Sequence, residues 1–101
     1  MKGGEFVKFV TENNRLTVTN NGSWVGELSF PALSDQRVVL ERTFVAPIYQ
    51  GQGIDSQLVA KFVEYAKQHH LTVKLMCPFA KQEFSRHPAY QEVLPVSDRW
   101  R

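Results

Sequence analysis

The chain lacks several features that would assign it to a specialised class of protein. It has a single cysteine, Cys77, so no intrachain disulfide can form, and a reducing compartment, the cytoplasm, is expected. No apolar run approaches the length of a membrane span, and no apolar signal segment follows the first residues. The net charge of +2, without Lys/Arg clustering, indicates neither a nucleic-acid nor a membrane partner.

Length and composition place the chain among small globular proteins. Its 101 residues suffice for one modest core, so we expect one domain spanning residues 1–101. The apolar fraction of 43% and the charged fraction of 22% are ordinary for such a domain. Three histidines and one cysteine at these spacings match no metal-site pattern, so no metal is expected.

The first forty residues are typical of a mainly antiparallel meander of about four strands. Asn13-Asn14 and Asn20-Asn21-Gly22 predict the first two turns, because Asn and Gly tolerate positive φ. Residues 32–36 are expected to form a polar loop after Pro31. The strands themselves are expected at residues 6–10, 15–19, 24–30 and 38–40.

The second half predicts an α+β fold. Apolar residues recur at helical spacing after Gly53 and predict a long helix that reaches His70. Residues 71–76 alternate as a fifth strand, and a strand after a long helix implies a crossover that would allow a parallel pair. Residues 80–87 suit a short C-terminal helix, which Pro88 ends.

A glycine loop joins the fourth strand to the long helix. Gly51 and Gly53 precede the helix N-terminus, where backbone N–H groups lack intrahelical partners and the dipole adds positive charge. Such a place suits a phosphate. A dinucleotide fingerprint would need a third glycine at Ser56, and a nucleotide P-loop would need Gly-Lys-Ser/Thr, which is absent. A turn that merely needs positive φ remains the structural alternative.

The segment from Val45 to Asp55 resembles motif A of the GNAT N-acetyltransferase superfamily, Gln/Arg-x-x-Gly-x-Gly/Ala preceded by Val-x-Pro. Gln50 and Gly53 match the motif, whereas Asp55 stands at its sixth position and does not. Three further segments resemble a minimal, single-domain GNAT-like family that reads acidic-His-Thr-x-Val, Cys-x-Phe/Tyr and His-Pro-x-Tyr. They are Glu41 to Val45, Cys77-Pro78-Phe79 and His87-Pro88-Ala89-Tyr90.

This resemblance implies that acetyl-CoA is a substrate whose pyrophosphate lies on the glycine loop. Asp55, in the first helical turn, would repel that pyrophosphate, so weakened binding is expected. The pantetheine arm would run alongside the strand that ends at Val45. The implied cofactor-binding residues are Phe44, Val45, Gln50, Gly51, Gln52, Gly53, Ile54, Asp55 and Phe79.

Two residues are candidates for catalysis. Cys77 could carry the acetyl group as a thiolate nucleophile, as the resemblance implies, or could be a small buried hydrophobe. Glu41 could act as a base, or could simply be paired or solvated. Arg42 stands where relatives commonly have a histidine, and an arginine cannot act as a general base. His87 could act as a base, or could have only a structural role at the end of a helix.

Two functional hypotheses of different classes follow. The first is an acetyltransferase that passes an acetyl group to an unidentified, amine acceptor, either directly or through Cys77. The second is a non-catalytic module that binds coenzyme A or acetyl-CoA, which the histidine lost at Arg42 and the absence of a substrate-binding insert favour. A protein-interaction domain that binds no cofactor is a third. We expect a monomer or a weak homodimer.

Overall fold

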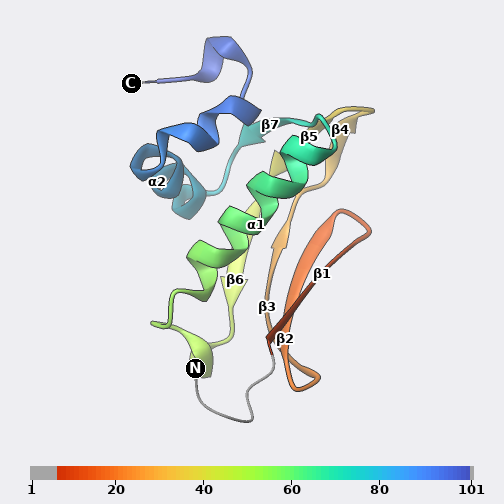
Figure 1. Ribbon diagram of the computed structural model, residues 1–101, viewed down its shortest axis with the longest axis vertical. Helices are drawn as coiled ribbons and strands as arrows, with labels where there is room; N and C mark the ends of the chain where they lie inside the picture. The colour runs from red at the N-terminus through yellow and green to blue at the C-terminus, as the bar shows by residue number, and fades with distance from the viewer. Residues whose placement is uncertain (1–6, 101) are drawn as a thin grey trace.

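The computed structural model describes residues 7–100, so Phe6, expected in the first strand, lies outside the described residues. This part of the chain forms seven strands, two α-helices and three short 3-10 helices (Figure 1). In chain order these are β1 (Val7–Glu12), β2 (Arg15–Asn20), β3 (Ser23–Ser29), β4 (Ala32–Ser34), β5 (Arg37–Leu40), β6 (Arg42–Val45), η1 (Pro47–Tyr49), α1 (Ile54–Gln68), β7 (Thr72–Leu75), α2 (Pro78–Arg86), η2 (Pro88–Val93) and η3 (Val96–Asp98).

The strands form two sheets that share one extended stretch of chain. A four-stranded antiparallel sheet has the order β1-β2-β3-β6, and a three-stranded sheet has the order β4-β5-β7. Within the smaller sheet, β5 pairs with β4 antiparallel and with β7 parallel. The α1 helix makes the crossover between β6 and β7 (Figure 1). The predicted α+β class and the parallel pair are therefore confirmed.

The prediction of a loop at residues 32–36 is wrong in part. Ala32–Ser34 forms β4, in which Ala32 is the register partner of Val38 in β5. All three residues of β4 are exposed, so burial imposes no alternation that the sequence could reveal. The expected strand at residues 38–40 is also followed closely by a further strand, β6, beyond a break at Glu41.

Both predicted asparagine turns are confirmed by their backbone angles. Asn13 and Asn14 have φ values of 54° and 57°, and Asn21 and Gly22 have φ values of 51° and 85°. Two successive residues at positive φ are what a two-residue type I′ hairpin turn requires. Local chemistry alone therefore specifies how β1, β2 and β3 connect.

The core lies between α1 and the two sheets. The buried face of α1 is the predicted apolar stripe, formed by Leu58, Val59, Phe62, Val63 and Ala66. At the centre, the Phe30 ring lies 5.0 Å from the Phe62 ring, with both side chains fully buried. The α1 helix contacts both β3 and β6, so it covers one face of the larger sheet (Figure 1). Helix α2 and the C-terminal 3-10 helices lie to one side of α1, beside β7.

Gly26 permits the close approach of β3 and β6. It is the register partner of Val45, and a Cβ atom added to Gly26 would collide with the Phe44 carbonyl oxygen and lie 3.1 Å from Val45 Cα. Both neighbours are backbone atoms, which cannot move aside without disturbing the pairing. The position of β6 therefore depends on the absence of a side chain at Gly26.

Gly26→Ala is expected to destabilise the fold by about 1–3 kcal/mol, because it overpacks a backbone contact in the sheet. The measurement is urea unfolding followed by circular dichroism. Ser23→Ala is the matched control, since Ser23 lies on the same strand as Gly26 and is exposed. Equal stability of the wild type and Gly26→Ala would contradict the proposed constraint.

Candidate functional site

The two sheets part at the end of β5. The Leu40 carbonyl accepts hydrogen bonds from the N–H groups of Met76 (3.1 Å) and Cys77 (3.0 Å). Beyond that point the chain continues as β6, which pairs only with β3 among the described strands. The edge of β6 that faces away from β3 therefore has no strand partner within residues 7–100.

The backbone of β6 directs alternate residues toward this open edge. The Ala46 N–H donates to the Val25 carbonyl at 2.7 Å, which fixes the phase of the ladder. Because main-chain groups alternate along an antiparallel strand, those of Thr43 and Val45 face the open edge. The Val45 carbonyl accepts a hydrogen bond from Gln50 Nε2 at 2.9 Å. The remaining groups at this edge can pair with an extended ligand.

The glycine loop ends beside this edge and starts α1. Gly51 and Gly53 have φ values of 83° and 81°, so the positive φ expected of them is present. No side chain caps the helix, and its first intrahelical bond runs from the Gln57 N–H to the Gly53 carbonyl at 3.1 Å. Earlier N–H groups of the helix consequently lack intrahelical acceptors. One of them, that of Ser56, donates to Asp55 Oδ1 at 2.8 Å.

A hollow of about 350 Å³ joins the open strand edge to the start of the helix. Its lining residues are Thr43, Phe44, Val45, Gln50, Gly51, Asp55 and Phe79. Six of these seven are among the residues that the sequence associates with the cofactor. The other three residues of that set, Gln52, Gly53 and Ile54, belong to the same loop and helix start but do not line the hollow.

Thr43 lines the hollow although sequence reasoning did not select it. Its position two residues before Val45 on the same strand places both on one face, and this alternation could have identified it. Thr43 also connects the hollow to Cys77, because Cys77 Sγ lies 3.7 Å from Thr43 Oγ1. The Cys77 side chain itself is only 3% exposed and precedes α2 as its N-cap residue.

Glu41 is separated from the other candidates. It is exposed, and its carboxylate accepts a hydrogen bond from Ser29 Oγ at 2.9 Å. Its N–H donates to the Ser29 carbonyl although the register partner of Ser29 is Arg42, so the chain has a bulge where the two sheets divide. Glu41 does not line the hollow, and a catalytic role for it stays a prediction.

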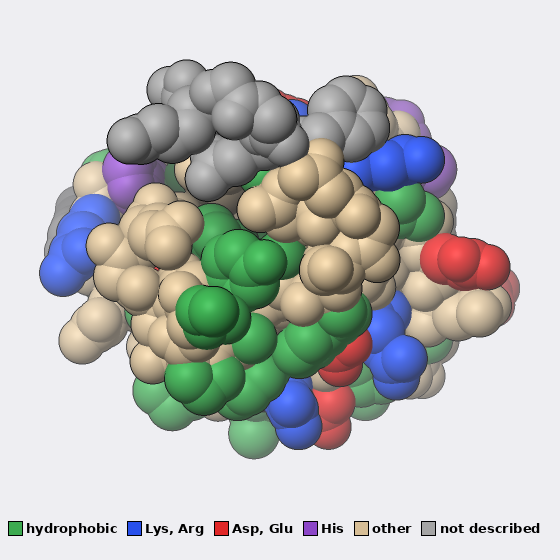
Figure 2. Space-filling model, turned by 90° about the horizontal axis from the view of Figure 1, so that it is seen from below, with side chains coloured by type: hydrophobic (Ala, Val, Ile, Leu, Met, Phe, Trp, Pro, Cys, Tyr) green, Lys and Arg blue, Asp and Glu red, His purple; other side chains and the backbone are tan. Residues whose placement is uncertain are grey.

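Exposed apolar side chains gather on the end of the molecule where α1 begins, which Figure 2 views. Phe44 stacks against Trp24, with ring centroids 5.8 Å apart, and both side chains are exposed. The Arg42 guanidinium lies 5.8 Å from the Phe44 ring centroid. Phe44 also lines the hollow, so this aromatic pair connects the hollow to the exposed surface at Trp24.

His87 belongs to a different cluster. Its ring stacks on Tyr90 at 4.7 Å, and its Nε2 lies 3.9 Å from the buried Glu83 carboxylate. Burial, with Glu83 and Glu64 nearby, raises the pKa of Tyr90. His87 does not line the hollow, so its contacts fit a structural role at the end of α2.

No three His, Cys, Asp or Glu side chains within residues 7–100 lie close enough to hold a metal ion. None of the described helices is long and apolar enough to cross a membrane.

The fold is that of an N-acetyltransferase. Over 93% of this chain and 91% of the other, it is similar to the solution structure of a GCN5-like protein from Staphylococcus aureus, with 21% identity and a TM-score of 0.68. It is also similar to a ribosomal-protein-alanine N-acetyltransferase from Brucella melitensis, with 16% identity, a TM-score of 0.53 and coverage of 89% and 67%. Ard1 from Thermoplasma volcanium is a third similar structure, with 21% identity, a TM-score of 0.54 and coverage of 61% and 43%.

The sequence itself identifies the family. Residues 13–93 match the profile of the GCN5-related N-acetyltransferases, and this segment is most of the chain. The protein therefore belongs to the GCN5-related N-acetyltransferase family, as the motifs predicted. No curated protein matched the sequence.

The burial of Cys77 predicts slow reaction with a thiol reagent. In the folded protein, modification by 5,5′-dithiobis(2-nitrobenzoate) is expected to be at least roughly a hundredfold slower than in the urea-unfolded chain, since the thiol must become exposed first. Thr43→Ala should accelerate the reaction by opening a path from the hollow, whereas the isosteric Thr43→Val should not. Rapid stoichiometric labelling of the folded wild type would contradict this burial.

Proposed function

We propose that this protein transfers the acetyl group of acetyl-CoA to an amine acceptor. The observation that carries the proposal is the hollow that connects the open edge of β6 to the start of α1. Its two halves present different chemistry: oriented N–H groups at the helix start, and strand-like backbone groups with apolar side chains further along. An elongated ligand with a phosphate at one end and an amide-containing arm at the other matches this order.

Acetyl-CoA would bind with its pyrophosphate at the glycine loop. Free backbone N–H groups and the helix dipole favour an anion there. The pantetheine arm would then extend along β6 and pair with the main chain of Thr43 and Val45, as a strand would. Phe79 and Phe44 would border this arm. The thioester would consequently lie near Thr43, at the point where the sheets part.

Direct attack by the amine is the simpler route from this arrangement. The amine nitrogen forms a bond to the thioester carbonyl carbon, the bond from that carbon to sulfur breaks, and coenzyme A leaves as a thiolate. The nitrogen then loses a proton, which the leaving thiolate or water can accept. A main-chain N–H at the open edge can stabilise the developing oxyanion. Transfer through Cys77 would first require that its buried Sγ reach the hollow past Thr43.

A non-catalytic module that binds coenzyme A is the second candidate function. Asp55 is the only ionisable side chain among the residues that line the hollow, and it lies at the end where the pyrophosphate would bind. Arg42 cannot serve as a general base, and Glu41 does not line the hollow. This arrangement supports cofactor binding more directly than it supports acid-base catalysis.

Asp55→Asn is expected to tighten acetyl-CoA binding by roughly fivefold, because it removes one like charge beside the pyrophosphate. Isothermal titration calorimetry gives the dissociation constants. Asp35→Asn is the matched control, since Asp35 is exposed and lies outside the lining of this hollow. Unchanged affinity in Asp55→Asn would place the pyrophosphate elsewhere, and no binding by the wild type would refute the proposed site.

Cys77→Ala separates the two chemical routes. After incubation with acetyl-CoA, denaturing mass spectrometry is expected to show an unmodified chain, while native spectra show a complex, because direct transfer leaves no acetyl-enzyme. Cys77→Ala should then retain most of the turnover measured with a panel of primary amines. A mass increase of one acetyl group that disappears in Cys77→Ala would instead assign Cys77 as the acceptor. Binding without turnover of any amine would favour the non-catalytic module.

A further inference from the structure

A second hollow lies beside β7, away from the glycine loop. It has a volume of about 300 Å³, and the residues around it are Lys74, Leu75, Lys81, Leu94, Asp98 and Trp100. It shares no lining residue with the hollow beside β6. Strand β7, helix α2 and the C-terminal segment each contribute to it, so three separate elements form its walls.

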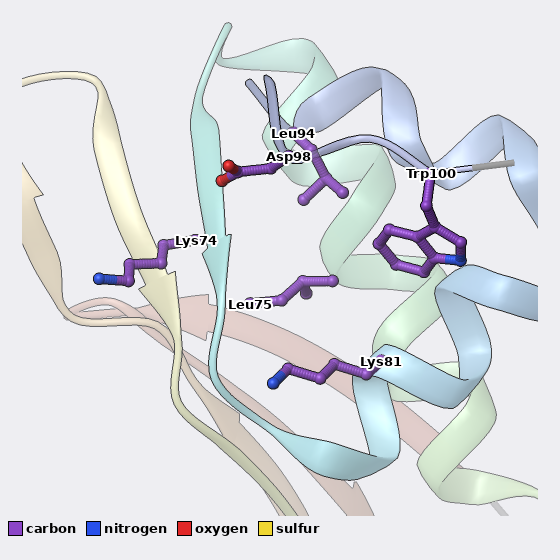
Figure 3. Close-up of a pocket in the computed structure, with 6 residues that line it drawn as sticks. All are labelled: Lys74, Leu75, Lys81, Leu94, Asp98 and Trp100. Atoms are coloured by element: carbon purple, nitrogen blue, oxygen red, sulfur yellow. The ribbon is translucent and has the colours of Figure 1, made fainter. Parts of the chain in front are cut away.

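Two leucines and a tryptophan form the apolar part of this hollow, and the tryptophan indole gives it one flat surface. Leu94 is buried, Leu75 is half-buried, and Trp100 is 39% exposed. Figure 3 shows Leu75, Leu94 and Trp100 directed toward a common space. The backbone of Trp100 is held in place, because its N–H donates to Gln91 Oε1 at 2.7 Å. A planar apolar group could therefore pack between the leucines and the indole face.

One side of the rim carries a positive charge that could bind an anion. Lys81, on α2, directs its ammonium toward the side of the hollow below Leu75, and Asp98 lies on the other side, beside Leu94 (Figure 3). The Lys74 side chain extends away from the hollow, on the opposite side of β7. Within residues 7–100 the structure shows no ion pair for Lys74, Lys81 or Asp98. The Lys81 ammonium is therefore the positive group directed toward the hollow, and it is available to a ligand.

We propose that this hollow is a second ligand site that binds small aromatic carboxylates. The aromatic ring would pack against Leu75, Leu94 and Trp100, and the carboxylate would pair with the Lys81 ammonium. Asp98 opposes the reversed orientation, because it would repel a carboxylate placed on its side of the hollow. The site is distinct from the hollow proposed for acetyl-CoA, since the two hollows share no lining residue.

The test is a titration of the full-length, ¹⁵N-labelled protein with 3-phenylpropionate, followed by two-dimensional NMR. Saturable shifts are expected at the Trp100 indole N–H and at the amides of Leu75, Lys81 and Leu94, but not at Gly51 or Gly53. The neutral analogue 3-phenylpropionamide should bind roughly threefold to tenfold more weakly, because it cannot form the ion pair. Shifts that do not saturate by about 10 mM ligand would overturn the proposal.

Two variants assign the charge recognition. Lys81→Gln should weaken 3-phenylpropionate binding roughly threefold to tenfold, so that the carboxylate and 3-phenylpropionamide bind with equal affinity. Lys61→Gln is the matched control, because Lys61 is also an exposed helical lysine but its Nζ lies 5.6 Å from the Phe9 ring, outside this hollow. Equal weakening in both variants, or no effect of Lys81→Gln, would overturn the role of Lys81. In a parallel titration, acetyl-CoA is expected to shift the amides of Gly51 and Gly53. The proposed function is therefore tested at different residues from the second site.

Discussion

The structure depends on one extended stretch of chain, residues 37–45, being divided between two sheets. Its first half pairs with β7 and its second half pairs with β3, and the change occurs at Glu41. The Leu40 carbonyl, which accepts from both Met76 and Cys77, closes the smaller sheet at that point. A strand cannot satisfy both of its edges once its neighbour has diverged. The unpaired edge of β6 is therefore a direct consequence of the division, and it is this edge that an extended ligand can complete.

The α1 helix packs on the larger sheet, and its start lies beside the open edge of β6. Its buried face packs against β3 and β6, and burial of a side chain such as Phe62 contributes roughly 1.5–3 kcal/mol. Because α1 must begin close to the end of β6, its free N–H groups lie beside the open strand edge. Packing and binding geometry are thus coupled: the residues that stabilise the fold also set where a phosphate and an extended arm could lie. The position of β6 also depends on Gly26, since β6 can approach β3 closely only where β3 has no side chain.

Features specified by local chemistry could be predicted from the sequence. The asparagine turns, the positive φ values of Gly51 and Gly53, and the limits of α1 follow from residue types within a few positions. The strand β4 could not be predicted, because its residues are exposed and carry no apolar alternation. The division at Glu41 and the placement of Thr43 between Cys77 and the hollow depend on pairing with distant strands. Glu41 is a candidate base on sequence grounds, but its carboxylate accepts a hydrogen bond from Ser29, a contact that depends on how the chain folds.

The composition of the hollow constrains the chemistry that it can perform. A thioester is already activated toward amines, so the enzyme needs chiefly to position the carbonyl and to stabilise its developing negative charge. Backbone N–H groups at the open edge can do both without a titratable side chain. The proton of the attacking amine is then the remaining requirement, and Asp55, the only ionisable lining residue, lies in the first turn of α1. The rate would consequently follow the fraction of acceptor that is deprotonated, which favours amines whose pKa lies near or below the working pH over strongly basic alkylamines.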